Sequence, residues 1–276
     1  MDILQPTVTI ATRSSRSAPF LERVLDGLQK QTGAKLIWSI VTQKSLTKAH
    51  EKCLERAKSL GIEVHITHAH SHETLGRLAN MAINAVASTY VLLHDDDDAL
   101  NQNFLGPALD IMRNKICVGV ACHAAFIRER SNKHFLDFIL TSGIEKVCLK
   151  DLKTNNVIVV HGLLYTRTAF EGIGGYDEKV KVAEDWLFNI NLCKSGKIAV
   201  LNLVCANVYL RKEPSMKSAI LHTNHQNHLY MKDLIRINEG FQNIVPLEKR
   251  INTLTQKFRR QIDRLFFRLS GKFLPR

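Results

Sequence analysis

The sequence predicts an α/β fold in which a Rossmann-like, mainly parallel central sheet is flanked by helices and followed by a helical C-terminal extension. Two observations lead to this prediction. Short runs rich in β-branched and apolar residues alternate with longer segments of helical periodicity, which is typical of βαβ units. Glycines also follow two of the helical segments, at Gly33 and Gly61, where a helix commonly ends in a left-handed residue.

The first half of the chain contains the clearest elements. We expect, in order, a strand at 7–12, a helix at 19–31, a strand at 35–42, a helix at 46–61, a strand at 62–67, a helix at 74–88 and a strand at 90–94. The pattern between 124 and 156 is mixed and predicts no particular element. The second half continues with a helix at 103–114, a strand at 117–121, a strand-like run at 157–166, a glycine turn at 172–178, a helix at 184–196, a strand at 197–203 and helices from 215 onward.

We therefore expect one larger domain at 1–214, with halves at about 1–122 and about 123–214, followed by a helical region at 215–276. The six cysteines form no CxxC pair, which favours a reduced, cytoplasmic protein. No apolar run approaches the 18 or so residues of a membrane span, and the amino terminus does not resemble a signal peptide.

Positive charge is concentrated at the carboxyl end of the chain. The formal net charge is +12, and residues 241–276 contain nine Lys or Arg against two acids, or 9 − 2 = +7. An apolar stripe at helical spacing runs between these basic residues: Leu254, Phe258, Ile262, Leu265, Phe266 and Leu269. Such a helix can lie on an anionic membrane surface, which predicts a peripheral protein on the inner face of the cytoplasmic membrane, or it can pack on the catalytic domain. Both interpretations stay open.

The stretch YVLLHDDDDAL, at 90–100, places four carboxylates after an apolar strand. Neighbouring like charges disfavour one another, so a cation is expected there, and hard divalent ions such as Mg²⁺ and Mn²⁺ prefer carboxylate oxygens. Ligands of open α/β sheets bind outside the carboxyl ends of the strands, which is where this run falls. A second acidic pair, Glu184-Asp185, opens a helix much later in the chain, and two separate acidic sites suggest a metal site and a general base.

Together these segments resemble the family-two glycosyltransferases, which have the A-type nucleotide-sugar glycosyltransferase fold; the resemblance covers roughly residues 7–218. Five motifs occur in the family's order. The Pro-Thr-x-Asn-like turn is matched loosely by Ala11-Thr12-Arg13-Ser14, and the Ala-Arg-Asn helix by Leu78-Ala79-Asn80. They are followed by the Asp-x-Asp motif at Asp95-Asp96-Asp97, the Gly-Gly-Phe-Asp-Glu turn at 174–178 and the Glu-Asp pair at 184–185.

The resemblance implies an inverting enzyme that moves a sugar from a nucleoside diphosphate sugar, with a UDP-sugar expected first, to a hydroxyl of a glycan or lipid-linked acceptor in cell-surface polysaccharide (lipopolysaccharide or capsule) synthesis. Asp185 is then the general base, and Asp95 and Asp97 hold Mn²⁺ or Mg²⁺. The expected nucleotide-binding residues are Ala11, Thr12, Arg13, Gln43, Asn80, Asp95, Asp96 and Lys212. The acceptor-side residues are Gly174, Gly175, Glu184 and Trp186. The resemblance also makes residues 1–214 the catalytic domain, with its donor half at about 1–122 and its acceptor half at about 123–214.

The chain departs from the family pattern at two places. Thr42-Gln43-Lys44-Ser45 stands where the family usually has Asp-Asp-Gly-Ser against the nucleotide base, and Gln43 can still read a base edge. Lys212 lies where a metal-binding histidine is common; charged, it cannot bind a metal but can neutralise a diphosphate.

Three alternatives compete with the transferase interpretation. A metal-dependent phosphoryl-transfer enzyme could use the aspartate run, and a non-catalytic module could bind nucleic acid or a membrane surface through its basic tail. The acidic pair could also serve only to stabilise a helix start. In addition, His65, His68, His70 and His72 could form a zinc site, although no cysteine or acid completes a recognised ligand spacing.

Overall fold

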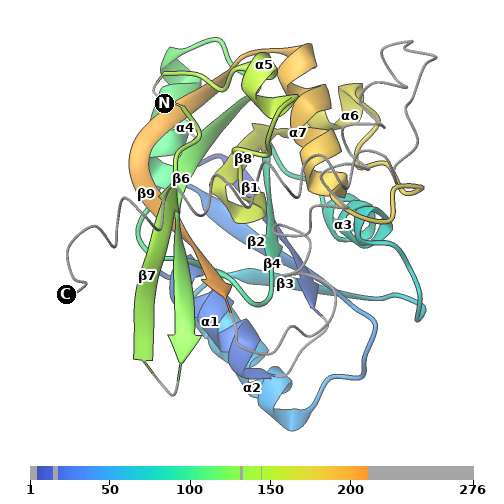
Figure 1. The fold of residues 1–276 in the computed structure, drawn as a ribbon. Helices are drawn as coiled ribbons and strands as arrows, with labels where there is room; N and C mark the ends of the chain where they lie inside the picture. Colours follow the sequence, from blue (N-terminus) through green and yellow to red (C-terminus); the bar gives the residue numbers. More distant parts are fainter. Residues whose placement is uncertain (1–4, 15–17, 131–132, 144, 211–276) are drawn as a thin grey trace, which may run out of the picture. The chain divides into compact units, whose positions relative to one another are not determined.

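The structure is a computed structural model that describes residues 5–14, 18–130, 133–143 and 145–210 (Figure 1). All of these residues belong to one unit of the chain, Met1–His222. The predicted helical region at 215–276, its apolar stripe and Lys212 lie outside the described residues.

The described strands form a single mixed sheet of nine strands. Its parallel part has the order β3-β2-β1-β4, made of β1 (Thr7–Ser14), β2 (Lys35–Thr42), β3 (Glu63–His68) and β4 (Tyr90–Asp95). These are the four strands expected in the first half of the chain, each within two residues of its predicted bounds. They confirm the α/β fold class and the parallel arrangement of this half.

The second part of the sheet is largely antiparallel. It contains β5 (Ala99–Leu100), β6 (Gly119–Arg130), β7 (Lys133–Leu140), β8 (Leu163–Thr166) and β9 (Ile198–Leu210). β8 joins the two parts, because it runs antiparallel to both β4 and β6, while β6 and β9 are parallel. The predicted strand at 117–121 is the start of β6, which continues into the unassigned segment and forms a hairpin with β7. The run at 157–166 is a strand only at its end, after the short helix η1 (Val160–Gly162).

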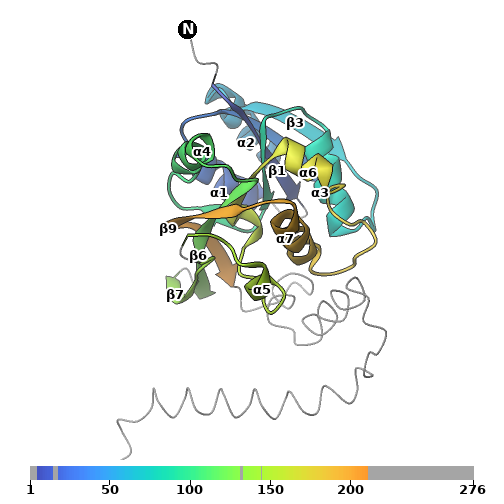
Figure 2. The same cartoon turned by 90° about the horizontal axis from the view of Figure 1, so that it is seen from above.

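Seven α-helices lie in the described part of the chain: α1 (Ala18–Leu28), α2 (Lys48–Ser59), α3 (Leu75–Asn84), α4 (Leu105–Asn114), α5 (Leu149–Leu152), α6 (Arg167–Gly172) and α7 (Glu184–Ser195). The apolar faces of α1, α2 and α4 pack with β1 and β2 in the main core, around Trp38 and Leu25. Seen from above, α3, α6 and α7 gather together (Figure 2). Here Tyr165, Phe170, Tyr176 and Phe188 form a second, aromatic cluster.

The buried cysteines contribute to the packing of the core. All six are free, and Cys53, Cys122 and Cys205 are buried among apolar side chains. Burial raises the pKa of the Cys53 thiol to about 12, so it is uncharged at neutral pH. These cysteines therefore act as small apolar core residues.

Candidate active site

The four aspartates form a turn between β4 and β5. The turn is held from two sides: Arg23 Nη1 donates to the main-chain carbonyl of Asp97 at 3.0 Å, and the amide of Tyr209 donates to the side-chain oxygen Oδ1 of Asp98 at 3.1 Å. His94, just before the turn, is fully buried, and its Nδ1–H donates to the carbonyl of Asp95 at 2.7 Å. Burial lowers the pKa of His94 to about 4, so this imidazole is neutral and adds no positive charge to the turn.

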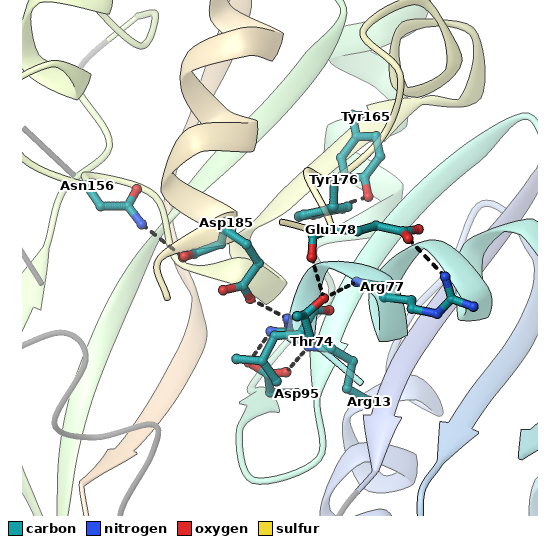
Figure 3. A network of polar contacts seen from close by, with 11 residues as sticks. Arg13, Thr74, Arg77, Asp95, Asn156, Tyr165, Tyr176, Glu178 and Asp185 are labelled. Atoms are coloured by element: carbon teal, nitrogen blue, oxygen red, sulfur yellow. Dashed lines mark hydrogen bonds and ion pairs between the residues drawn. The ribbon is translucent and has the colours of Figure 1, made fainter. Parts of the chain in front are cut away.

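Arg13 joins the aspartate turn to the second acidic pair. It lies on β1 directly beside Asp95 on β4, and its guanidinium donates to both carboxylate oxygens of Asp95, at 2.7 and 2.9 Å (Figure 3). Nη1 of the same guanidinium donates to Glu184 Oε1 at 2.5 Å and to the carbonyl of Leu75 at 3.3 Å. The structure thus brings together two acidic motifs that are far apart in the sequence.

Burial and charge act against one another in this cluster. Burial alone would raise the pKa of Asp95, but Arg13 outweighs it and holds that pKa below its usual value. Burial raises the pKa of Glu184, and the nearby Asp185 adds to that, while Arg13 opposes both. The ionised form of Glu184 therefore depends on the guanidinium.

Asp185 follows Glu184 in the first turn of α7 and is oriented by an amide that sequence reasoning missed. Asn156 Nδ2 donates to Asp185 Oδ2 at 2.9 Å (Figure 3). Asn189 Nδ2 in turn donates to Asn156 Oδ1 at 3.1 Å. Asn156 ends the segment whose pattern predicted no element, and no sequence signal distinguishes it from any other loop asparagine. These two hydrogen bonds fix the orientation of the Asp185 carboxylate.

The glycine turn is anchored on α3 by Asn80. The side chain of Asn80 accepts from the amide of Tyr176 at 2.9 Å and donates to the carbonyl of Tyr176 at 2.9 Å and to Glu178 Oε1 at 3.0 Å. Thr74 Oγ1 also donates to the carbonyl of Glu178. Two motifs of the sequence therefore contact one another, and the amide group of Asn80, expected to face the nucleotide, is engaged by the turn.

Both glycines of this turn have left-handed backbones, with φ of +80° at Gly174 and +73° at Gly175. A Cβ at Gly175 would lie 2.8 Å from Asn80 Oδ1 and 3.0 Å from the ring of Phe170, whereas one at Gly174 would meet nothing within 4 Å. We expect Gly174→Ala to lower the free energy of unfolding by about 1 kcal/mol through backbone strain alone. Gly175→Ala should cost about 3 kcal/mol, because overpacking adds to the strain. Urea unfolding of the two variants measures the difference, and equal losses would contradict the close packing of this turn on Asn80.

Two further residues expected at the nucleotide lie inside the sheet. Ala11 and Thr12 are 0% exposed, and Thr12 Oγ1 accepts from the indole of Trp38 at 2.8 Å. They lie within β1, because this strand continues through the four residues of the predicted turn to Ser14. Their side chains therefore shape the sheet under the candidate site.

The remaining predicted site residues, Gln43, Asp96 and Trp186, differ in how deeply they are buried. Gln43 lies just after β2, and its Nε2 donates to the carbonyl of His70 at 2.9 Å. Asp96 is 3% exposed. Trp186, expected on the acceptor side, is 2% exposed and donates from its indole to the carbonyl of Leu152, which makes it part of the core between α5 and α7.

The donor set at the aspartate turn fits a divalent cation that is shared with a ligand. Within the described residues no group of three or more His, Cys, Asp or Glu gathers to hold a metal, and this includes His65 to His72, where His65 contacts Glu63 instead. Mg²⁺ commonly uses one or two carboxylates together with substrate phosphates, and Asp97 with the remaining lone pairs of Asp95 supplies such a set. These residues are therefore suited to bind a cation jointly with a diphosphate.

Comparison with known proteins decides the family of this chain. The model of the family described as "Glycosyl transferase family 2" matches residues 7–174, from the start of β1 to the glycine turn. The chain belongs to glycosyl transferase family 2. This membership confirms the resemblance to the family and decides against the phosphoryl-transfer and non-catalytic interpretations. No curated protein matches the chain in a sequence search.

Several solved structures are similar in fold to this family member. The structure of Staphylococcus aureus TarS 1–349 in complex with UDP-GlcNAc has a TM-score of 0.65 at 15% identity, over 97% of this chain and 76% of that one. A structure of S. aureus TarS has a TM-score of 0.61 at 16% identity over 88% of this chain, which spans about half (46%) of that TarS chain. The mannosyltransferase PcManGT of Pyrobaculum calidifontis, in complex with GDP-Man and Mn²⁺, has a TM-score of 0.58 at 14% identity, over 88% of this chain and 67% of that one.

These likenesses establish the A-type glycosyltransferase fold of the family 2 chain. Among its described helices, none has the length and apolar character that crossing a membrane requires.

Proposed function

We propose that this chain transfers a sugar from a nucleoside diphosphate sugar to a hydroxyl group, with inversion at the anomeric carbon. The observation that supports this most strongly is the link from Asp95 through Arg13 to Glu184, because it brings the aspartate turn and the carboxylate next to Glu184 into one site. This site lies at the carboxyl ends of parallel strands, where open α/β sheets bind their ligands.

In this mechanism Asp185 is the general base. Asn156 holds one of its oxygens, so that the other is available to accept the proton of the acceptor hydroxyl. The hydroxyl oxygen then attacks the anomeric carbon as the bond to the diphosphate breaks, and the diphosphate leaves without needing a proton. A cation at Asp97 and Asp95 would supply electrostatic stabilisation of the charge that grows on the diphosphate.

The nucleobase of the sugar donor can be a pyrimidine or a purine. Two structural relatives contain UDP-GlcNAc and GDP-Man, respectively, and the second also contains Mn²⁺. We propose a UDP-sugar as the first donor to test. In this proposal Gln43, just after β2, hydrogen-bonds to the nucleobase.

A thermal-shift screen tests the proposed donor site. UDP and GDP, each with and without Mn²⁺, are added to the full chain. At a concentration of about 100 times Kd, a ligand stabilises the folded state by about 2.7 kcal/mol. For a domain of this size that raises Tm by roughly 5–10 °C. We expect the rise only when nucleotide and cation are present together, since the aspartate turn alone offers few ligands. Failure of both nucleotides to shift Tm in the presence of Mn²⁺ would refute the proposal.

For the acceptor, we propose a glycan or a lipid-linked glycan of a cell-surface polysaccharide, reached by an enzyme that binds the inner face of the cytoplasmic membrane. The support is the basic, apolar-striped sequence at 241–276, in which each near-surface basic residue can contribute about 1 kcal/mol toward an anionic leaflet. We expect the full chain to float with anionic vesicles but not with neutral ones. Changing Arg259, Arg260, Arg264 and Arg268 together to Gln should abolish flotation; unchanged flotation would exclude this role for the tail.

A further inference from the structure

The guanidinium of Arg13 uses all three of its nitrogens inside the protein. Nε and Nη2 donate to Asp95, and Nη1 donates to Glu184 and to the carbonyl of Leu75. The residue is 6% exposed, so the side chain expected to contact the nucleotide lies under the site. Its contacts join three elements, because Asp95 ends β4, Glu184 begins α7 and Leu75 begins α3.

The two carboxylates do not depend equally on Arg13. Asp95 is already positioned by its backbone, because β4 pairs with β1 in parallel from Tyr90 to Asp95. The start of α7 is not part of the sheet and is preceded by an irregular segment. Its N-cap, Ala183, has a left-handed backbone (φ 58°, ψ 34°) and makes no side-chain capping hydrogen bond. Such a conformation is unfavourable for alanine and persists only when surrounding contacts hold it.

We propose that Arg13 is a positioning residue that holds the start of α7 against the sheet and thereby sets where Asp185 lies relative to the aspartate turn. This rests on the proposed role of Asp185 as general base. The ion pair to Glu184 is buried on both sides, with side chains 5% and 3% exposed. A planar guanidinium can donate to two carboxylates in fixed directions, whereas the ammonium of lysine is a single point of charge.

The test compares Arg13→Lys with Arg167→Lys. Arg167 is a matched control, because its guanidinium donates to the carbonyls of Ile83 and Val86, at 3.0 and 2.8 Å, in the same domain. We expect Arg13→Lys to lower kcat about 10- to 100-fold through displacement of the base. Its donor KM should stay within about threefold of the wild type, because Asp95 keeps its backbone position. Arg167→Lys should change neither constant by more than about threefold.

Amide hydrogen exchange tests whether Arg13 holds the start of α7, and it does not depend on enzyme activity. The amide of Leu187 donates to the carbonyl of Ala183 in the first turn of α7, and we expect the peptide containing it to exchange faster in Arg13→Lys than in the wild type or Arg167→Lys. If Arg13→Lys does not fold, Glu184→Ala breaks the same link from the other side and keeps the pair between Arg13 and Asp95. The same loss of kcat and faster exchange are then expected.

Unchanged kcat and unchanged exchange in the folded variant would overturn the proposal, as would equal losses in Arg167→Lys. The exchange result also separates this inference from the proposed function. If the wild-type protein transfers no sugar, the proposed function fails, while faster exchange at α7 would still establish that Arg13 holds this helix.

Discussion

We expect Asp185→Asn to lower kcat for sugar transfer by about 10²- to 10⁴-fold, the usual contribution of a general base. The change keeps the size of the side chain, and its amide oxygen can still accept from Asn156. Nucleotide binding should persist, because the proposed donor site is the aspartate turn. Steady-state kinetics of nucleoside diphosphate release measures the effect.

Asp26→Asn is the control for this prediction. Asp26 is an exposed acid of α1, and its carboxylate accepts from Arg56 Nη2 at 2.9 Å. Its replacement should leave kcat within about threefold of the wild type. If Asp185 served only to stabilise the start of α7, Asp185→Asn would cost about 0.3–1 kcal/mol of stability and leave kcat unchanged, which contradicts its assignment as the base.

We expect Asp97→Ala to remove the cation-dependent part of nucleotide binding. Arg23 donates to the main-chain carbonyl of Asp97, a contact that alanine retains, so the turn should keep its backbone path. We expect the rise in Tm with nucleotide and Mn²⁺ to fall to the value with nucleotide alone. Transfer should drop about 10³-fold or more, since a metal that stabilises a leaving diphosphate contributes several kcal/mol.

The control for Asp97 is Asp110→Ala, on the exposed surface of α4, where the carboxylate pairs with Arg113 in the next turn of the helix. This variant should keep both the cation-dependent shift in Tm and the activity. A full shift in Asp97→Ala would mean that the cation is held elsewhere, and the aspartate run would then need another role.

The parallel half of the sheet was predictable because its signals are local. β1, β2, β3 and β4 are short apolar runs separated by amphipathic helices, and this periodicity can be read without knowing any contact. The β6–β7 hairpin was not predictable in the same way. Phe135, Leu136, Phe138 and Ile139 are all about half exposed, so β7 lacks the alternation of buried and exposed side chains that identifies a strand.

The order of the motifs led to the proposal of Asp95, Asp97 and Asp185 as site residues, but their contacts could not be read from the sequence. Asn156 escaped detection, since an isolated loop asparagine has no pattern. The amide group of Asn80 turned out to be engaged by the glycine turn, which no sequence spacing indicated.

Periodicity and motif order were thus sufficient for the fold class and the family, because each depends on neighbours along the chain. Which side chains meet was decided only by the folded protein. Arg13 and Glu184 are 171 positions apart, and their contact exists because β1 lies beside β4 while α7 packs over the same edge of the sheet. A buried arginine takes its role from the groups that surround it. Here these are two carboxylates and one main-chain carbonyl, and they come from three separate parts of the sequence.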